Sequence, residues 1–429
     1  MTPLPEIENR KSIYSWALYD WANSAFATTV IAGFFPIFFK TYWSAGDDVT
    51  LSTLRLGTAN SAASIAVALL APFLGAIADK GSAKKRFLFF FALMGVVMTS
   101  GLYLVSRGAW QLAIAVFVAA SIGFSASIIF YDSLLVSVAE TRRTDYVSAL
   151  GYSLGYLGGG VLFAVNVLMT LHPHWFGLAD ASQAVRLSFI LVALWWAVFS
   201  IPLMLFVKEP RGEASPGWET VKAGVHQLGR TFGDLRRLRV VFLFLIAYFL
   251  YIDGVQTIAR MGVDYGLSLG FEANSLIVAL LITQFVGFPA ALFFGKIGER
   301  IGAKTGIYIG ITVYVGTCVF GFFMKTVTDF YILAITIGLV QGGVQSLSRS
   351  LYSRLIPTNK AAEFFGFYNM LGKFSTMLGP ILMGWVGVLT GNPRFSVLSV
   401  AVLLIAGGLL LVPVSEQAGR RAASRMETP

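Results

Sequence analysis

Long apolar segments alternate with short polar segments along almost all of the 429 residues. An α-helix that crosses a membrane needs roughly 20 mostly apolar residues, and twelve segments meet this requirement. The pattern therefore predicts an all-α, polytopic membrane protein. The twelve segments run approximately from 16 to 40, 54 to 77, 87 to 106, 110 to 138, 147 to 171, 185 to 207, 240 to 260, 273 to 295, 306 to 325, 329 to 350, 363 to 389 and 394 to 413. Segments 110–138 and 363–389 are the least regular, because polar residues interrupt one end of each.

The composition favours lipid as the solvent of this chain. Hydrophobic residues make up 56% of it and charged residues only 13%, whereas about a quarter of a soluble protein is charged. One very large soluble core is the alternative, but soluble chains of this length divide into domains with charged surfaces. The first apolar segment is too long for a signal peptide and has no clear cleavage site of small residues, so we expect it to remain as a helix.

The net charge of +10 would suggest a nucleic-acid partner in a soluble protein, but most of the cations lie in the predicted loops. Lys and Arg in short loops mark the cytoplasmic side of a membrane. Their distribution predicts that both termini are cytoplasmic, in a bacterial inner membrane, with no role in binding nucleic acid. We assign Arg349, Arg354 and Lys360 to the loop after segment 329–350, and we place Lys373 within a helix.

The longest polar stretch, residues 208–239, divides the chain into two groups of six predicted helices. We therefore expect an N-terminal bundle of residues 1–207, a cytoplasmic linker of residues 208–239, and a C-terminal bundle with a short tail of residues 240–429. The linker is either a plain tether or contains an amphipathic helix near 218–236 on the anionic inner leaflet.

The two halves share an internal repeat. The sequence after the second predicted helix and the sequence after the eighth share a glycine, an acidic residue and cations, 220 positions apart. Farther along, Tyr131, Leu134, Gly151, Leu157 and Gly158 are repeated 221 positions later as Tyr352, Leu355, Gly372, Leu378 and Gly379. A duplicated six-helix unit is an architecture that transporters use to build a central site between two halves.

The repeated loops have a possible mechanical role. Glycine lets helix ends approach closely, and a carboxylate can accept hydrogen bonds from the N-terminus of a neighbouring helix. These loops would then hold one conformation closed; the alternative is that they are merely positively charged cytoplasmic loops. The candidate gating residues are Gly75, Asp79, Lys80, Lys84, Lys85, Gly295, Glu299 and Arg300.

The sequence resembles the major facilitator superfamily, whose signature between helices 2 and 3 is matched by Gly75, Asp79, Lys80, Lys84 and Lys85. It is more closely similar to the "unknown major facilitator" branch, which includes the fungal vacuolar amino-acid effluxers of autophagy. Four segments carry this closer likeness: residues 19–28, 155–159, 251–257 and 365–373. The resemblance implies two six-helix bundles, alternating access, and export of amino acids or small peptides. Segment 110–138 contains no Arg or Lys, unlike many proton antiporters, which argues against drug/proton antiport.

Few ionisable residues lie within the predicted helices, where each costs at least ~2.5 kcal/mol at the membrane centre. Asp253 and Lys373 are near mid-depth, and Asp20 lies in the inner third of the first helix. Our hypothesis is that Asp253 binds a substrate amine or a proton, that Asp20 supports or gates it, and that Lys373 contacts a substrate carboxylate. Alternatively, Asp253 and Lys373 neutralise each other as a structural pair. Neutral polar residues that could line a cavity, or bond helices together, are Asn23, Gln256, Thr257, Gln341, Gln345 and Asn369.

The sequence contains no nucleotide-binding loop and predicts neither a cofactor nor a metal site. An ion gradient, most simply of protons, is then the energy source for moving a small-molecule substrate. The scattered ionisable residues do not predict an enzyme. A sensor or scaffold remains an alternative, as does transport of an amphipathic lipid or a sugar, and we expect a monomer.

Overall fold

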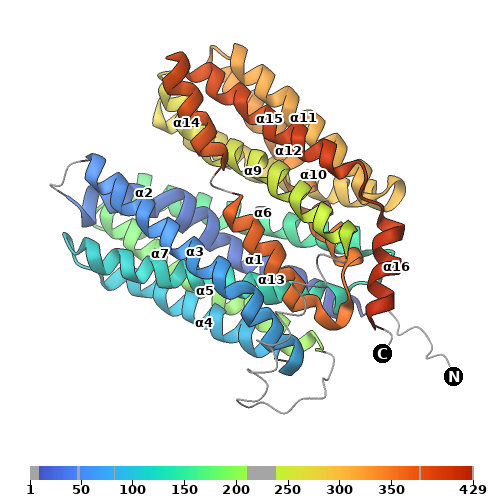
Figure 1. Cartoon of the computed structure of the whole chain (residues 1–429). Helices are drawn as coiled ribbons and strands as arrows, with labels where there is room; N and C mark the ends of the chain where they lie inside the picture. Colours follow the sequence, from blue (N-terminus) through green and yellow to red (C-terminus); the bar gives the residue numbers. More distant parts are fainter. Residues whose placement is uncertain (1–8, 46–48, 82, 210–237, 376–377, 428–429) are drawn as a thin grey trace.

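The computed structural model describes residues 9–45, 49–81, 83–209, 238–375 and 378–427, and these residues form helices and connecting turns with no strand. This confirms the predicted all-α fold (Figure 1). The long helices of the N-terminal half are α1 (Arg10–Ala25), α3 (Val49–Gly81), α4 (Lys84–Gly101), α5 (Trp110–Val138), α6 (Thr144–Leu171) and α7 (Ala181–Phe206). The C-terminal half holds α9 (Arg239–Ser268), α10 (Ala273–Ile301), α11 (Ala303–Phe323), α12 (Val327–Leu355), α13 (Ala361–Phe374), α14 (Leu378–Thr390), α15 (Pro393–Leu411) and α16 (Glu416–Glu427).

Eleven of the described helices are long and apolar enough to cross a membrane. The first of them joins α1 to two π-helical stretches, Phe26–Phe34 and Phe39–Trp43, with the short α2 (Phe35–Phe38) between them. In the segment predicted at 363–389, α13 ends at Phe374 and α14 begins at Leu378.

Each half has its own hydrophobic core. One large core is built almost entirely from residues between α1 and α7, with Ala362 of α13 added to it, and includes Trp16, Trp43 and Trp196, all fully buried. The other is built from residues of α9 through α16. The predicted linker lies almost entirely in 210–237, outside the described residues, and so does the amphipathic helix expected there.

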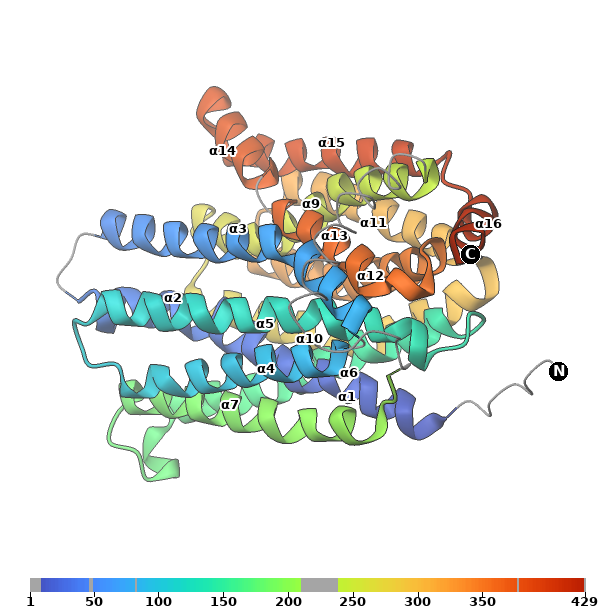
Figure 2. The same cartoon turned by 60° about the horizontal axis from the view of Figure 1, so that its bottom comes forward.

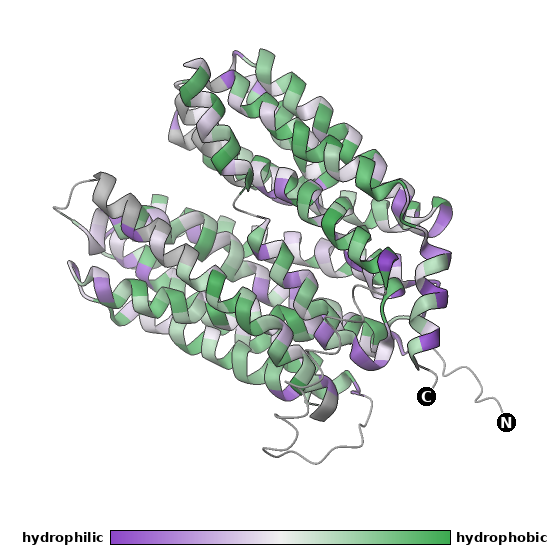
Figure 3. Ribbon diagram, viewed as in Figure 1, coloured by the Kyte–Doolittle hydropathy of each residue, from purple (hydrophilic) through white to green (hydrophobic). Residues whose placement is uncertain are grey.

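The two halves approach each other at the end of the molecule where α1 begins and α16 lies, and their ribbons diverge toward the end with α2 and α14 (Figures 1 and 2). The contacts between them are made chiefly by α3 with α13 and by α6 with α10 and α12. Hydrophobic residues cover most of the long helices, and hydrophilic residues stand out on α16 (Figure 3). The molecule therefore has one end at which the halves are held together.

Helix α12 corrects one sequence prediction. It continues to Leu355, so Arg349 and Arg354 are helical rather than loop residues, and both are buried. Apolar periodicity places the end of this helix near 350, because the polar residues of its last turns interrupt the apolar pattern. They face the other half of the protein.

Candidate functional site

The most elaborate polar contact between the halves surrounds Arg349, near the C-terminal end of α12. Its side chain is 2% exposed. The guanidinium donates through Nη1 to Asp132 Oδ1 on α5, at 3.0 Å, and lies 3.5 Å from Asp20 Oδ2 on α1. Its Nε donates to Ser148 Oγ on α6 at 2.9 Å, and its Nη2 donates to the Ser148 carbonyl at 2.8 Å. One arginine of the C-terminal half thus ties together three helices of the N-terminal half.

Aromatic rings enclose the same guanidinium. Its central carbon lies 4.4 Å from the ring centre of Tyr152, 4.9 Å from that of Trp16 and 5.4 Å from that of Tyr131. Rings within about 6 Å attract a cation through their negative faces. The Tyr131 hydroxyl also donates to Asp20 Oδ2 at 2.8 Å. These rings limit contact with water and hold the arginine in place.

Two of the predicted polar residues join this network, which we call the Arg349 network (Asp20, Tyr131, Asp132, Ser148, Arg349 and Asn369). Asp20 is one of them. Asn369 on α13 donates through Nδ2 to Asp132 Oδ2 at 3.1 Å. A third candidate, Asn23, is buried one turn beyond Asp20 on α1. Asp132 therefore contacts two helices of the opposite half.

A second ion pair between the halves lies closer to the end of α12. Arg354 Nη1 is 2.8 Å from Asp145 Oδ1 on α6, and Ser350 also donates to Asp145. The Nε of Arg354 is 3.0 Å from Glu416 Oε1, in the first turn of α16. Arg354 consequently links the N-terminal half, the C-terminal half and the C-terminal helix.

The third contact involves the predicted gating residue Asp79. Its carboxylate accepts hydrogen bonds from the backbone N–H groups of Ala362, at 3.2 Å, and Glu363, at 2.8 Å, at the start of α13. Lys84 Nζ lies 2.9 Å from the same carboxylate. A carboxylate at a helix N-terminus satisfies donors that have no partner within the helix. We call this arrangement the Asp79 latch (Asp79, Lys84 and the backbone of Ala362 and Glu363).

Glycines make the close approach of the halves possible. A side chain at Gly75 would collide with the backbone of Ala362 on α13. At the repeat-related position, a Cβ on Gly295 would lie 2.5 Å from the Cβ of Ala149 on α6. The two repeats thus use equivalent glycines to pack α3 on α13 and α10 on α6.

The remaining gating candidates do not all face the other half. Lys85 Nζ donates to the carbonyls of Met204 and Val207 at the end of α7, at 2.8 and 2.7 Å. Glu299 and Arg300 are exposed near the end of α10. Lys80 lies in the last turn of α3, and its side chain is outside the described part of the structure. Lys85 therefore caps the last long helix of its own half.

Asp253 and Thr257 lie in a different place, between α9 and the start of α14. Asp253 is 0% exposed, and its Oδ1 accepts from the Gly379 backbone N–H at 2.9 Å and from Thr257 Oγ1 at 3.1 Å. Gln256 and Lys373 are half-buried, on α9 and in the last turn of α13 respectively. The structure thus separates Asp253 from the Arg349 network and ties it to the first turn of α14.

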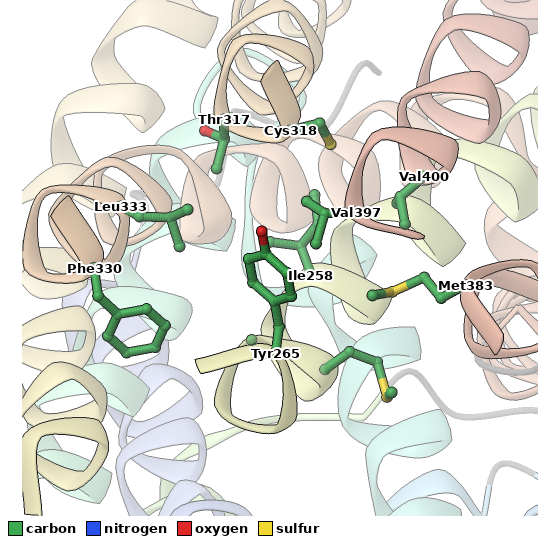
Figure 4. Close-up of a pocket in the computed structure, with 11 residues that line it drawn as sticks. Ile258, Tyr265, Thr317, Cys318, Phe330, Leu333, Met383, Val397 and Val400 are labelled. Carbon is green, nitrogen blue, oxygen red and sulfur yellow. The ribbon is translucent and has the colours of Figure 1, made fainter. Parts of the chain in front are cut away.

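A small apolar cavity of about 20 Å³ lies inside the C-terminal half, among α9, α11, α12, α14 and α15 (Figure 4). Ile258, Leu333, Met383 and Val400 line it, and so does Cys318, which is buried. The hydroxyl of Tyr265 donates to the Gly321 carbonyl at 2.8 Å. This volume accommodates about one water molecule, so the cavity is too small for an organic substrate.

Sequence reasoning missed Arg349 and gave Asp132 no role in the site. A signal for Arg349 was present, because Gln341, Gln345 and Arg349 are spaced by four residues and therefore share one face of α12. The two glutamines were recognised as cavity candidates. Position 349 already falls within the predicted segment 329–350, so the same spacing places the arginine on the face of the two glutamines.

Comparison with known proteins identifies the family. The family described as "Vacuole effluxer Atg22 like" matches residues 56–424. The chain belongs to this Atg22-like family. An uncharacterized MFS-type transporter of Bacillus subtilis, YxiO, is 39% identical over 405 residues, which are 94% of each chain. Autophagy-related protein 22 of the yeast Yarrowia lipolytica is 27% identical over 332 residues, 68% of this chain but 55% of the fungal protein, so the chain spans about half of that relative.

Solved structures show the same fold. The human organic anion transporter MFSD10 superposes with a TM-score of 0.71, covering 95% of this chain and 100% of that one at 14% sequence identity. The Atg22-like chain is therefore a multi-pass integral membrane protein of the major facilitator superfamily, as the sequence resemblance implied, and its relatives are transporters.

Proposed function

We propose that this protein is a secondary active exporter of amino acids or small peptides, driven by the proton gradient. It works as a monomer in a bacterial inner membrane, with both termini in the cytoplasm. The description of its family, "Vacuole effluxer Atg22 like", supports movement of a solute out of a membrane-enclosed compartment. In this orientation, the end at which the halves are held together faces the cytoplasm.

The observation that carries the proposal is the Arg349 network. A buried ion pair is costly to build, and removing one partner of such a pair typically destabilises a protein by about 3–5 kcal/mol. Here the arginine lies on one half and both carboxylates lie on the other. Separation of the halves would pull these charges apart and admit water, so the network discriminates between two conformations, as alternating access requires.

The proposed substrate region lies at the end of α13, beside the first turn of α14. Helix ends near mid-depth commonly supply binding groups in transporters. Lys373 lies about 20 Å along from the start of α13 and would pair with a substrate carboxylate. Asp253, supported by Thr257, would pair with the substrate amine once α14 moves away from α9. Gln256 and Asn369 would supply neutral hydrogen bonds.

Transport by purified protein in liposomes tests this proposal. Vesicles are loaded with radiolabelled amino acids and dipeptides and placed in acidic medium, so that protons entering drive substrate out. We expect efflux that a protonophore abolishes, with a loss of at least tenfold in Arg349→Met and in Asp253→Asn. Asp329→Asn is the matched control, because Asp329 caps the outer start of α12 within its own half.

Three outcomes would contradict the proposal. Efflux that ignores the pH gradient would remove proton coupling. Movement of sugars or amphipathic lipids in place of amino acids and peptides would replace the substrate class. Wild-type rates in a folded Asp253→Asn protein would remove that residue from the substrate site.

A further inference from the structure

The charges of the Arg349 network do not balance. Two carboxylates, Asp20 and Asp132, approach the same guanidinium nitrogen, Nη1 of Arg349. We propose that Asp20 carries the coupling proton and that Arg349, on the opposite half, responds to its charge. The inference rests on the proposed function, since it names the coupling site of that transporter.

The described groups around Asp20 supply one positive charge for two negative ones. From the N-terminal half, α1 contributes Trp16 and Asn23, α5 contributes Tyr131, and α6 contributes Ser148 and Tyr152, all of them neutral. From the C-terminal half, α12 contributes Arg349 and α13 contributes the neutral Asn369. An uncompensated charge is costly in a membrane protein interior, and two carboxylates close together favour holding one proton between them. One proton makes the network neutral.

The geometry selects Asp20 rather than Asp132 as the carrier. Asp132 is 5% exposed, has the shorter contact with Arg349, at 3.0 Å, and uses its other oxygen for Asn369. Asp20 is 13% exposed, and its contact with the guanidinium is 3.5 Å. Asp132 is thus the fixed counter-ion of Arg349, whereas Asp20, which also accepts from the Tyr131 hydroxyl at 2.8 Å, is less closely paired with the guanidinium and more accessible.

Gly151 on α6 keeps this place open for the Asp20 carboxylate. A Cβ at that position would lie 2.6 Å from Asp20 Oδ2, 2.8 Å from the Tyr131 hydroxyl and 3.0 Å from Arg349 Nη2. Any side chain there would displace the carboxylate from its hydrogen bonds. Glycine is therefore required by the close approach of three polar groups.

Protonation of Asp20 changes the attraction between the halves. When Asp20 is ionised, Arg349 is attracted to two carboxylates of the N-terminal half, and the cytoplasmic end is held closed. A proton from the outer side that binds an Asp20 oxygen removes one of these attractions, so the halves separate more readily at that end. The proton then leaves to the cytoplasm, and the ionised carboxylate favours closure again. This cycle moves one proton inward for each opening.

Spin-label distances across the cytoplasmic end test the inference without a substrate. Cysteines replace the exposed Thr141 of the N-terminal half and Gln417 of α16. The background is Cys318→Ala, which removes the single native cysteine. In lipid nanodiscs at a series of pH values, we expect wild-type protein to lengthen this distance as the pH falls, with one midpoint.

The variants separate the two carboxylates. We expect Asp20→Asn to populate the longer distance at every pH and to lose the titration, whereas Asp20→Glu keeps it. Asp132→Asn should still titrate, with the midpoint at least one unit lower, because Asp20 then has Arg349 to itself. Asp329→Asn, outside the network, should titrate as wild type.

Two spin-label results overturn the inference: an unchanged titration in Asp20→Asn, or a distance that responds to added Na⁺ at fixed pH and not to pH. The proposed function fails separately. If the distance titrates through Asp20 but vesicles show no transport driven by a pH gradient, the proton site stands and the transporter proposal falls. If gradient-driven transport persists in Asp20→Asn, the transporter proposal stands and Asp20 is not the proton carrier.

Discussion

Replacing Asp79 by alanine should open the end of the protein at which the two halves are held together. The Asp79 latch holds the backbone N–H groups of Ala362 and Glu363 across the interface, and Lys84 neutralises the carboxylate. The Asp79 side chain is only 2% exposed. Alanine leaves these donors without an acceptor in the closed conformation but changes little in an open one, where water reaches them.

The size of the effect follows from these contacts. A buried donor left without its partner costs about 1–3 kcal/mol. Loss of the two backbone hydrogen bonds and of the Lys84 ion pair should therefore destabilise the closed conformation by about 3 kcal/mol in total. Since each 1.4 kcal/mol is a factor of ten, the ratio of closed to open protein should fall by roughly 100-fold. A population that is closed in about 99 of 100 molecules would become about evenly divided.

The assay is the Thr141 to Gln417 spin-label distance, measured at one alkaline pH at which Asp20 stays ionised. Asp329→Ala is the matched control. Asp329 also accepts from two backbone N–H groups, those of Lys325 and Thr326 at 3.0 and 2.9 Å, but at the start of a helix of its own half. A distance distribution in Asp79→Ala that equals that of wild type, in protein of normal thermal stability, would refute the role of the latch.

The remaining expectations concern packing, topology and the tail. Gly95→Ala should lower the unfolding temperature, because a Cβ there collides with the ring of Trp196 and overpacking costs about 1–3 kcal/mol. The control Gly316→Ala on α11, where a Cβ would meet nothing within 4 Å, should leave the unfolding temperature unchanged. Equal melting curves for the two variants would contradict this packing. Membrane-impermeant reagents should label cysteines in the 208–239 connector and at Gln417 from the same side of the bilayer; labelling from opposite sides would exclude an even number of crossings. Glu416→Gln should weaken the hold of α16 on Arg354 and increase proteolysis within α16, whereas unchanged cleavage would mean that this ion pair contributes nothing.

Apolar periodicity was sufficient to predict most of the fold, because a membrane helix must satisfy its backbone within itself and present apolar side chains to lipid. The segment at 110–138 coincides with α5, and the repeated glycines at 75 and 295 lie at equivalent contacts between the halves. Periodicity failed where polar residues face another helix rather than water. Arg349 and Arg354 were read as loop cations for that reason.

The site was harder to predict, because its members come from α1, α5, α6, α12 and α13, which only the packed fold brings together. Asp20 and Asn369 were recognised singly, from their chemistry and their place in a helix. Their shared partners, Arg349 and Asp132, depend on which helices adjoin across the interface. No spacing along the chain encodes that adjacency between two halves.

The placement of α16 has a practical consequence for anyone producing this protein. Gly419 packs so closely that a side chain there would collide with Leu355, and Glu416 completes the ion pairs of Arg354. Truncation after Val414 is attractive for crystallisation because it removes a charged tail. It would, however, expose Arg354, which lies where the two halves meet. Protein made for such work should keep the chain through residue 427, and affinity tags should follow a spacer beyond it.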